Sequence, residues 1–357
     1  MNTSRLARVI ANMEAQGLDQ IVVTSTASVF YLTGIYVEPM ERMLALYIRS
    51  DGCCALYANE LFAIQPQEGL PMVLHTDSDD PVAALAGALR PGKLGIDKSW
   101  QSKFLIRILE LRPDVLPVLG SAPVDDARMC KDAAEIAAMR RASRINDQVV
   151  EAAIAAVAEG ARESELAALV EQLFRQHGAD RSSEGQLVCF GPNGADPHHA
   201  PNDTVIREGD SVVMDIFIPI QRYWCDMTRT VFFRSVSGEG RRVYETVKAA
   251  NLAAEAVIRP GIPMCDIDRA ARKVIEDAGY GPFFTHRLGH GCGLDCHEPP
   301  DNSSACQVIA RPGMVFSVEP GIYLPGKLGV RIEDLVLVTE DGCEVLNAAS
   351  KELRVVG

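Results

Sequence analysis

Residues 211–233 read SVVMDIFIPIQRYWCDMTRTVFF and place two aspartates inside an otherwise apolar stretch. Both halves are rich in β-branched and aromatic residues, which is typical of strands joined by a short corner. If Ile220 and Gln221 form a two-residue turn, the hairpin register puts Asp215 directly opposite Asp226 on one face. Cross-strand Cβ atoms lie about 4.5–5.5 Å apart and like charges there repel, so the two carboxylates need a shared proton or a cation.

For this pair alone, two other interpretations stay open. In the first, both aspartates lie on a face of the hairpin that is exposed to solvent. In the second, a bulge at Pro219 breaks the register, so the two aspartates are not opposite each other. The rest of the chain therefore has to show whether further ligands accompany Asp215 and Asp226.

Histidines are concentrated in one region. Five of the seven lie between residues 198 and 297, and they are His198, His199, His286, His290 and His297. Gly289 and Gly291 flank His290, which lets backbone approach closely whatever this segment touches. Neutral imidazole is the commonest metal ligand and also a good general acid or base.

Two glutamates extend the pattern. Glu319 ends the apolar run MVFSV, and Glu333 lies inside VRIEDLVLV, where we predict a strand with Arg331 on the same face. Together with the two aspartates they supply four negative charges, which two divalent cations would balance. Oxygen ligands and one imidazole suit manganese, cobalt, iron or zinc. Two such ions can generate a nucleophile from water at neutral pH, so hydrolysis is the natural chemistry.

A structural zinc site is the competing interpretation of this region. Cys292 and Cys296 flank the histidines with a CxxxC spacing. That spacing is not a standard zinc-finger spacing, and no second cysteine pair follows at a useful distance. We therefore do not expect a structural zinc ion.

The chain divides into two predicted domains, 1–125 and 126–357. The first part alternates helical and strand-like patterns, which predicts a small α/β domain. Its expected elements are a helix near the start, strands at 21–23, 43–48 and 93–96, a helix at 81–89 and a linker at 117–130.

The second part groups helices and paired strands, which predicts an α+β domain. Asp132 and Glu135 have the spacing of a helix-capping box, and a long helix should run from there to Gly160. The other expected helices span 163–177, 240–258 and 266–278, and the expected strands span 186–190, 211–219, 223–234, 314–319 and 330–338.

Composition limits the partners. The 357 residues carry 35 basic and 48 acidic side chains, a net charge of 35 − 48 = −13. This disfavours nucleic acid and an anionic membrane surface as partners. No apolar run is long enough to cross a membrane, and the start lacks a secretory signal. The ten cysteines are therefore expected to be free thiols in a cytoplasmic protein.

The motifs around these candidate residues resemble those of a known protein family. The chain resembles the pita-bread metallopeptidases, which include Xaa-Pro dipeptidase (prolidase), Xaa-Pro aminopeptidase, methionine aminopeptidase and creatinase. The matching contexts, in chain order, are MDI, CDMTRT, GHGCGLDCHE, SVEPGIY and GVRIED. The segment YLTG at 31–34 resembles the creatinase-type N-terminal domain, which argues against a bare methionine aminopeptidase. Creatinases lack the metal ligands that this chain has.

The resemblance implies a role for each matched residue. Asp215 would bind one ion, His290 and Glu319 the other, and Asp226 and Glu333 would bridge both. Glu319 would also take the proton of the attacking water and pass it on. The remaining implied roles are substrate binding and oxyanion stabilisation by His198 and His297, and orientation of Glu333 by Arg331. The ions would be two divalent metals, with manganese first and cobalt, zinc or iron as alternatives, and the chain would form a homodimer.

The resulting prediction is hydrolysis of the bond between an N-terminal residue and proline in a di- or oligopeptide. We place Xaa-Pro dipeptidase first because nothing suggests a third domain, and aminopeptidase on longer peptides second. A dipeptidase has to hold a free carboxylate, and Arg311, the only arginine between His297 and Glu319, does not clearly fit that duty.

Two departures from the family pattern keep further alternatives open. Phe217 stands where glycine is usual, which we expect to narrow the pocket, and Cys292 and Cys296 replace aliphatic residues. Because of Phe217, the alternative that the chain is a hydrolase of small amides or amidines stays open. A binding protein without catalysis is disfavoured, because all five ligands are present.

Overall fold

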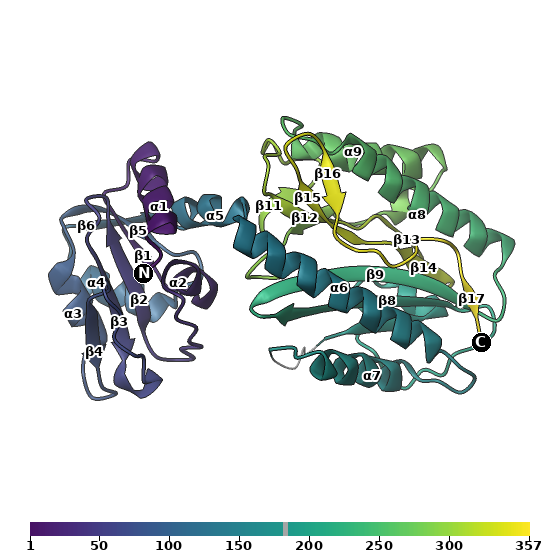
Figure 1. Cartoon of the computed structure of the whole chain (residues 1–357), viewed down its shortest axis with the longest axis horizontal. Coiled ribbons are helices and arrows are strands. Elements are labelled where there is room, and N and C mark those ends of the chain that lie inside the picture. The colour runs from purple at the N-terminus through teal and green to yellow at the C-terminus, as the bar shows by residue number, and fades with distance from the viewer. Residues whose placement is uncertain (181–184) are drawn as a thin grey trace. The chain divides into compact units, whose positions relative to one another are not determined.

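The structure, a computed structural model, describes residues 1–180 and 185–357 (Figure 1). It divides into two units, Met1–Arg128 and Met129–Gly357. Among the described residues, no helix is both long and apolar enough to span a bilayer.

A six-stranded mixed sheet forms the first unit, in the order β4-β3-β2-β1-β5-β6. Its strands are β1 (Gln20–Val23), β2 (Leu44–Arg49), β3 (Cys54–Asn59), β4 (Met72–His75), β5 (Gly92–Ile96) and β6 (Val115–Leu119). Its helices are α1 (Thr3–Ala15), α2 (Thr26–Thr33), α3 (Pro81–Ala88), α4 (Ser102–Leu111) and α5 (Ala122–Met129). Val82 and Leu85 of α3 pack with Phe104 and Ile108 of α4 against the sheet. The α/β prediction for this part is confirmed.

The linker predicted at 117–130 is wrong, because strand β6 and helix α5 occupy this segment. The prolines that suggested a linker occupy positions where regular structure tolerates them. Pro117 lies on β6, the edge strand of the sheet, and Pro123 lies in the first turn of α5. Proline costs little at both places, since neither requires its missing N–H.

In the second unit, helices α6 and α7 cover a four-stranded sheet ordered β17-β9-β8-β7 (Figure 1). These elements are α6 (Ala133–Ala155), α7 (Glu163–Gln176), β7 (Leu187–Phe190), β8 (Ser211–Ile220), β9 (Tyr223–Phe233) and β17 (Val355–Val356). The capping box predicted for α6 is present. Asp132 accepts from the amide of Glu135, and the Glu135 carboxylate accepts from the amide of Asp132 over 2.9 Å. The helix ends at Ala155, before Gly160.

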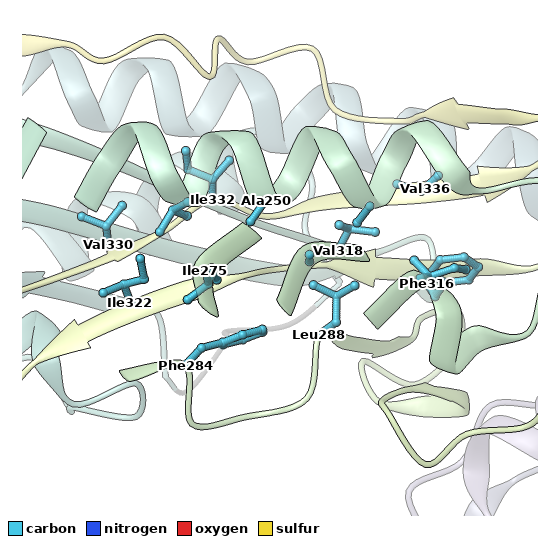
Figure 2. Close-up of a cluster of buried hydrophobic side chains, with 14 of the residues drawn as sticks. Ala250, Ile275, Phe284, Leu288, Phe316, Val318, Ile322, Val330, Ile332 and Val336 are labelled. Atoms are coloured by element: carbon cyan, nitrogen blue, oxygen red, sulfur yellow. The ribbon is translucent and has the colours of Figure 1, made fainter. Parts of the chain in front are cut away.

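A second sheet, ordered β11-β10-β12-β15-β16, and the hairpin β13-β14 pack against helices α8 and α9. The elements are α8 (Gly238–Val257), α9 (Met264–Asp277), β10 (Gly289–Gly291), β11 (Glu298–Asn302), β12 (Val315–Val318), β13 (Gly321–Leu324), β14 (Leu328–Arg331), β15 (Asp334–Val338) and β16 (Cys343–Val345). Figure 2 shows the core between them, where Ala250 of α8 and Ile275 of α9 face Val318, Ile322 and Val330. The α+β prediction is confirmed.

The predicted register of the β8–β9 hairpin is wrong by two residues. Gln221 and Arg222 form the turn, both with positive φ (51° and 72°), as a type I′ hairpin turn requires. This turn keeps Ile220 inside the core, 3% exposed, whereas the predicted turn would have exposed it. Asp215 consequently pairs with Thr228 and not with Asp226. Because the shift is two residues, both aspartates still lie on the same face.

The strand predicted at 330–338 is also wrong, because it is two strands. β14 pairs with β13, whereas β15 pairs with β12 and β16. Between them, the amide of Glu333 donates to the carbonyl of Thr228 over 3.1 Å. Glu333 therefore lies at a break between strands and not in the middle of one.

Candidate functional site

A cavity of about 580 Å³ opens in the second unit. It is lined by every residue that the sequence analysis assigned to metal binding or catalysis: His198, Asp215, Asp226, His290, His297, Glu319, Arg331 and Glu333. Residues that are more than 130 positions apart in the chain therefore meet on one wall.

The hydrophobic core sets the position of three of these side chains. Each follows a fully buried core residue by one or two positions. The pairs are Leu288 and His290, Val318 and Glu319, and Ile332 and Glu333. Figure 2 shows the core member of each pair. Because core residues are tightly packed, the polar side chains that follow them have little freedom to move.

Three of the side chains form a cluster suited to a metal ion. Potential ligand atoms of Asp226, His290 and Glu333 all lie within 4.8 Å of one another. Nε2 of His290 is 3.7 Å from Oδ2 of Asp226 and 3.4 Å from Oε1 of Glu319. Nδ1 of His290 donates to the carbonyl of Gly291 over 3.1 Å. That bond leaves the lone pair of Nε2 directed at the carboxylates, as a metal ligand requires.

Asp215 is held by an arginine. Nη2 of Arg331 donates to Oδ2 of Asp215 over 2.7 Å, while Oδ1 of Asp215 is buried without a hydrogen-bond partner among the described residues. A buried carboxylate oxygen that lacks a partner suits a further ligand. Asp215 therefore extends the cluster.

Arg331 does not make the predicted contact with Glu333. Its Nε donates to Oγ1 of Thr228 over 3.0 Å, and that hydroxyl in turn donates to Oε2 of Glu333 over 2.7 Å. Nη1 of Arg331 donates to the hydroxyl of Tyr323 over 2.9 Å. The guanidinium thus holds Asp215 directly and Glu333 through Thr228.

Sequence reasoning missed Thr228 and Tyr323. Thr228 is two residues after Asp226, on the same face of β9, so the strand pattern contained a signal for it. Tyr323 is separated from Arg331 by the β13–β14 hairpin, and only tertiary contact brings the two together.

Burial and mutual repulsion raise the pKa of two carboxyls. For Asp226 the causes are burial first and then Asp215 and Glu319, and for Glu333 they are burial first and then Asp226 and Glu319. Buried carboxylates this close need opposite charge to ionise together. Burial also lowers the pKa of His290 to about 3, which keeps the imidazole neutral and able to bind a metal. The cluster therefore fits divalent cations.

The carboxylate of Glu319 is held by a hydrogen bond from a nearby serine. Oγ of Ser317 donates to Oε1 of Glu319 over 3.1 Å and accepts from the amide of His290 over 3.0 Å. Burial raises the pKa of Glu319 to about 7, with a further contribution from Asp215 and an opposing one from Arg331. A carboxyl with a pKa near neutrality can both accept and donate a proton.

The remaining histidines differ in their surroundings. The ring of His297 lies 4.0 Å from that of His290, at 71°, and burial lowers the pKa of His297. Both ring nitrogens of His286 are engaged, Nδ1 with the carbonyl of Arg287 at 2.7 Å and Nε2 with the hydroxyl of Tyr323 at 2.8 Å. His286 therefore supports the wall of the cavity.

His199 lies outside the cavity and contacts a buried acid that sequence reasoning missed. Its Nε2 is 3.1 Å from Oε2 of Glu163. Glu163 also accepts from the amide of Phe190 over 2.6 Å and from Nδ2 of Asn193 over 3.0 Å. The carboxylate thereby holds the loop that carries His198.

The positions that depart from the family pattern also reach the site. Sγ of Cys296 donates to Oδ2 of Asp226 over 3.3 Å, and Sγ of Cys292 contacts the carbonyl of Trp224 at 3.6 Å. All ten cysteines are free. In the described residues, the group of potential metal ligands consists of Asp226, His290 and Glu333 and contains no cysteine. Phe217 lines the cavity beside Trp224, with ring centroids 6.3 Å apart.

Comparison with known proteins relates the whole chain to one family. Residues 137–340 match metallopeptidase family M24, and residues 5–130 match the creatinase/prolidase N-terminal domain. An uncharacterized peptidase of Staphylococcus aureus (strain USA300) is 34% identical over 358 residues, covering 98% of this chain and 100% of that protein.

Solved structures agree with this relationship. A recombinant prolidase from Thermococcus sibiricus superposes with a TM-score of 0.93 at 34% identity, covering 100% of this chain and 99% of that one. A dipeptidase from Pyrococcus horikoshii OT3 superposes with a TM-score of 0.92 at 34% identity, covering 99% and 100%.

Proposed function

This chain belongs to metallopeptidase family M24, and from that premise we propose that it is a Xaa-Pro dipeptidase. One observation carries the proposal: four carboxylates and one neutral histidine line the same cavity as His198, His297 and Arg331. The similarity to a prolidase and a dipeptidase over essentially the full length supports the substrate class. A cavity of about 580 Å³ suits a ligand of dipeptide size.

Asp215, Asp226, His290, Glu319 and Glu333 would hold two divalent metal ions, with manganese as our first choice. Bound ions would supply a Lewis acid for the scissile carbonyl and would make water acidic enough to attack at neutral pH. The family supports divalent metal, and the mutual repulsion of the buried carboxylates supports its place in the cavity.

Glu319 carries the proton. It lies at the edge of the cluster, where Ser317 holds one of its oxygens, and it takes a proton from the attacking water. It then delivers that proton to the proline nitrogen as the bond breaks. Protonation turns the proline nitrogen into an amine that can leave, and the released proline gains the N–H that its tertiary amide lacked.

His198 and His297 bind the substrate. Both line the cavity beside the cluster. A neutral imidazole can donate one hydrogen bond to the oxygen of the tetrahedral intermediate, where negative charge develops. Arg331 contributes by fixing Asp215 and, through Thr228, Glu333.

The proposal is tested by leucine release from Leu-Pro and from Leu-Pro-Pro, using chelator-stripped protein resupplied with Mn(II). Cleavage of Leu-Pro but not Leu-Pro-Pro is the expected result. Preference for Leu-Pro-Pro would make the enzyme an aminopeptidase on longer peptides. If two metals bind and neither peptide is cleaved, the Xaa-Pro assignment is wrong and a panel of small amides and amidines is the next test.

Two further properties belong to this proposal. The ten free cysteines support a reducing compartment, and we propose the cytoplasm. We also propose a homodimer, which light scattering would contradict by giving the mass of a single chain.

A further inference from the structure

A dipeptidase has to recognise the free carboxylate of its substrate, and the cavity contains a candidate partner for it. In the part of the chain that the structure describes, the lysine and arginine side chains on the cavity wall are those of Arg287 and Arg331. Arg331 is buried, and Asp215, Thr228 and Tyr323 occupy its three nitrogens. Each nitrogen of Arg331 is thus already engaged by a protein group.

Arg287 differs from Arg331 in its exposure to solvent and in the number of its hydrogen bonds. Its side chain is 38% exposed, and its Nη1 forms an ion pair with Oδ1 of Asp301, whose side chain is 54% exposed. Among the described residues, the hydrogen bonds of its guanidinium involve Nη1 alone. A guanidinium has five N–H groups, so most of its donors can bind a carboxylate without displacing Asp301.

The position of Arg287 relative to the cluster suits this duty. Arg287 is three residues before His290, and Asp301 is the strand partner of His290 in the β10–β11 pair. The ion pair therefore lies beside the residue that we propose binds metal. A dipeptide carboxylate lies one residue, about 3.5 Å of extended chain, beyond the scissile bond, and a tripeptide carboxylate lies two residues beyond it. A cation held at a fixed distance from the scissile bond can therefore distinguish a dipeptide from a tripeptide.

We propose that Arg287 binds the C-terminal carboxylate of the dipeptide and that Asp301 orients its guanidinium at the mouth of the cavity. This inference rests on the proposed function and deepens it, because it names the residue that would make the enzyme a dipeptidase. It also provides the carboxylate partner that Arg311 did not offer in the sequence.

The test compares Leu-Pro with Leu-Pro-amide, which lacks the carboxylate. For Arg287→Met we expect the KM for Leu-Pro to rise about 10- to 100-fold, because a charged hydrogen bond is lost, and the KM for Leu-Pro-amide to change less than about 3-fold. Arg287→Lys should give an intermediate KM for Leu-Pro, because it keeps the charge without the planar fork. Arg269→Met is the matched control, since Arg269 is also an exposed arginine paired with an aspartate, Asp266, but it lies outside the cavity.

A second variant changes Asp301, the other member of the ion pair. Asp301→Asn removes the carboxylate that orients Arg287, so the KM for Leu-Pro should rise about 2- to 5-fold while the KM for Leu-Pro-amide stays constant. Metal content and melting temperature establish that each variant is folded.

The possible failures are distinguishable. Equal increases of KM for both substrates in Arg287→Met, or no increase for either, would overturn the role of Arg287 and leave the proposed function standing. A wild-type enzyme that cleaves neither substrate with its metals bound would instead overturn the proposed function itself.

Discussion

The guanidinium of Arg331 donates to Oδ2 of Asp215 across 2.7 Å, and both side chains line the same cavity. The side chain of Arg331 is 4% exposed, so its charge is compensated by protein groups and not by water. Its two other hydrogen bonds, to Thr228 and Tyr323, fix its plane. The arginine therefore positions one proposed metal ligand directly and a second, Glu333, through the threonine hydroxyl.

Replacing this arginine should affect metal binding as well as rate. Arg331→Lys keeps the charge but cannot contact all three partners at once, and we expect activity or metal affinity to fall about 10- to 100-fold. Metal titration and hydrolysis of Leu-Pro measure this. Arg112→Lys is the control, because Arg112 also forms a two-bond ion pair with an aspartate, Asp114, but lies outside the cavity lining. Equal loss of metal affinity in both variants would contradict a specific role for Arg331.

The two proposed bridging carboxylates should be indispensable. Asp226→Asn or Glu333→Gln removes one negative charge from the cluster while nearly preserving shape, so activity should disappear and the metal content should fall below two ions per chain. Elemental analysis after dialysis gives the metal content. A variant that stays active with its full metal content would refute the bridging role of that residue.

Replacement of His297 should lower activity without removing the metal ions. It packs against His290, and we assign it to substrate binding and not to the metal ligands. His297→Ala should therefore lower kcat about 100-fold, through loss of oxyanion stabilisation, while both metals stay bound. Loss of a metal from this variant would show that His297 is a ligand and not a substrate-binding residue.

In the metal-free protein, ionisation of Glu319 should lower stability as pH rises. In the folded state the pKa of Glu319 is about 7, above the ordinary value of 4.5 for a glutamic acid. A raised pKa means that the folded state favours the protonated form. The resulting contribution to stability is complete below about pH 4.5 and is lost as pH rises through about 7.

Melting temperatures of chelator-treated protein at pH 5.5 and 7.5 measure this effect. Relative to Glu319→Gln, we expect the wild type to lose melting temperature between pH 5.5 and 7.5, by about 2–4 °C for each kcal/mol lost. Added divalent metal should reverse the trend, because it binds the ionised carboxylates. Glu319→Gln is the control, and in this variant the loss of stability that Glu319 contributes should be absent. An equal pH dependence of the melting temperature in metal-free wild type and Glu319→Gln would contradict the assigned pKa.

The sequence was sufficient to predict which residues share the cavity, because the proposed ligands stand in or beside apolar runs and their motifs resemble those of the pita-bread metallopeptidases. Val318 and Ile332 are examples, since each is a core residue followed immediately by an acid. Local hydrophobic pattern also predicted both domain classes, and the spacing of Asp132 and Glu135 predicted the capping box.

Other features depend on tertiary contacts and could not be predicted in this way. The hairpin turn falls at Gln221 and Arg222 because Ile220 is buried in the folded unit, which the local sequence does not reveal. The break at Glu333 results from a hydrogen bond to Thr228, a residue 105 positions earlier in the chain. The contact of Arg331 with Asp215 arises in the same way, across 116 positions.

The most direct test of the central claim is the activity of chelator-stripped protein on Leu-Pro as Mn(II) is added in known ratios to the chain. We predict no hydrolysis without metal and a rise that saturates at two equivalents per chain. Full activity in the stripped protein, or no activity at any ratio although two ions bind, would contradict the account of a two-metal Xaa-Pro dipeptidase.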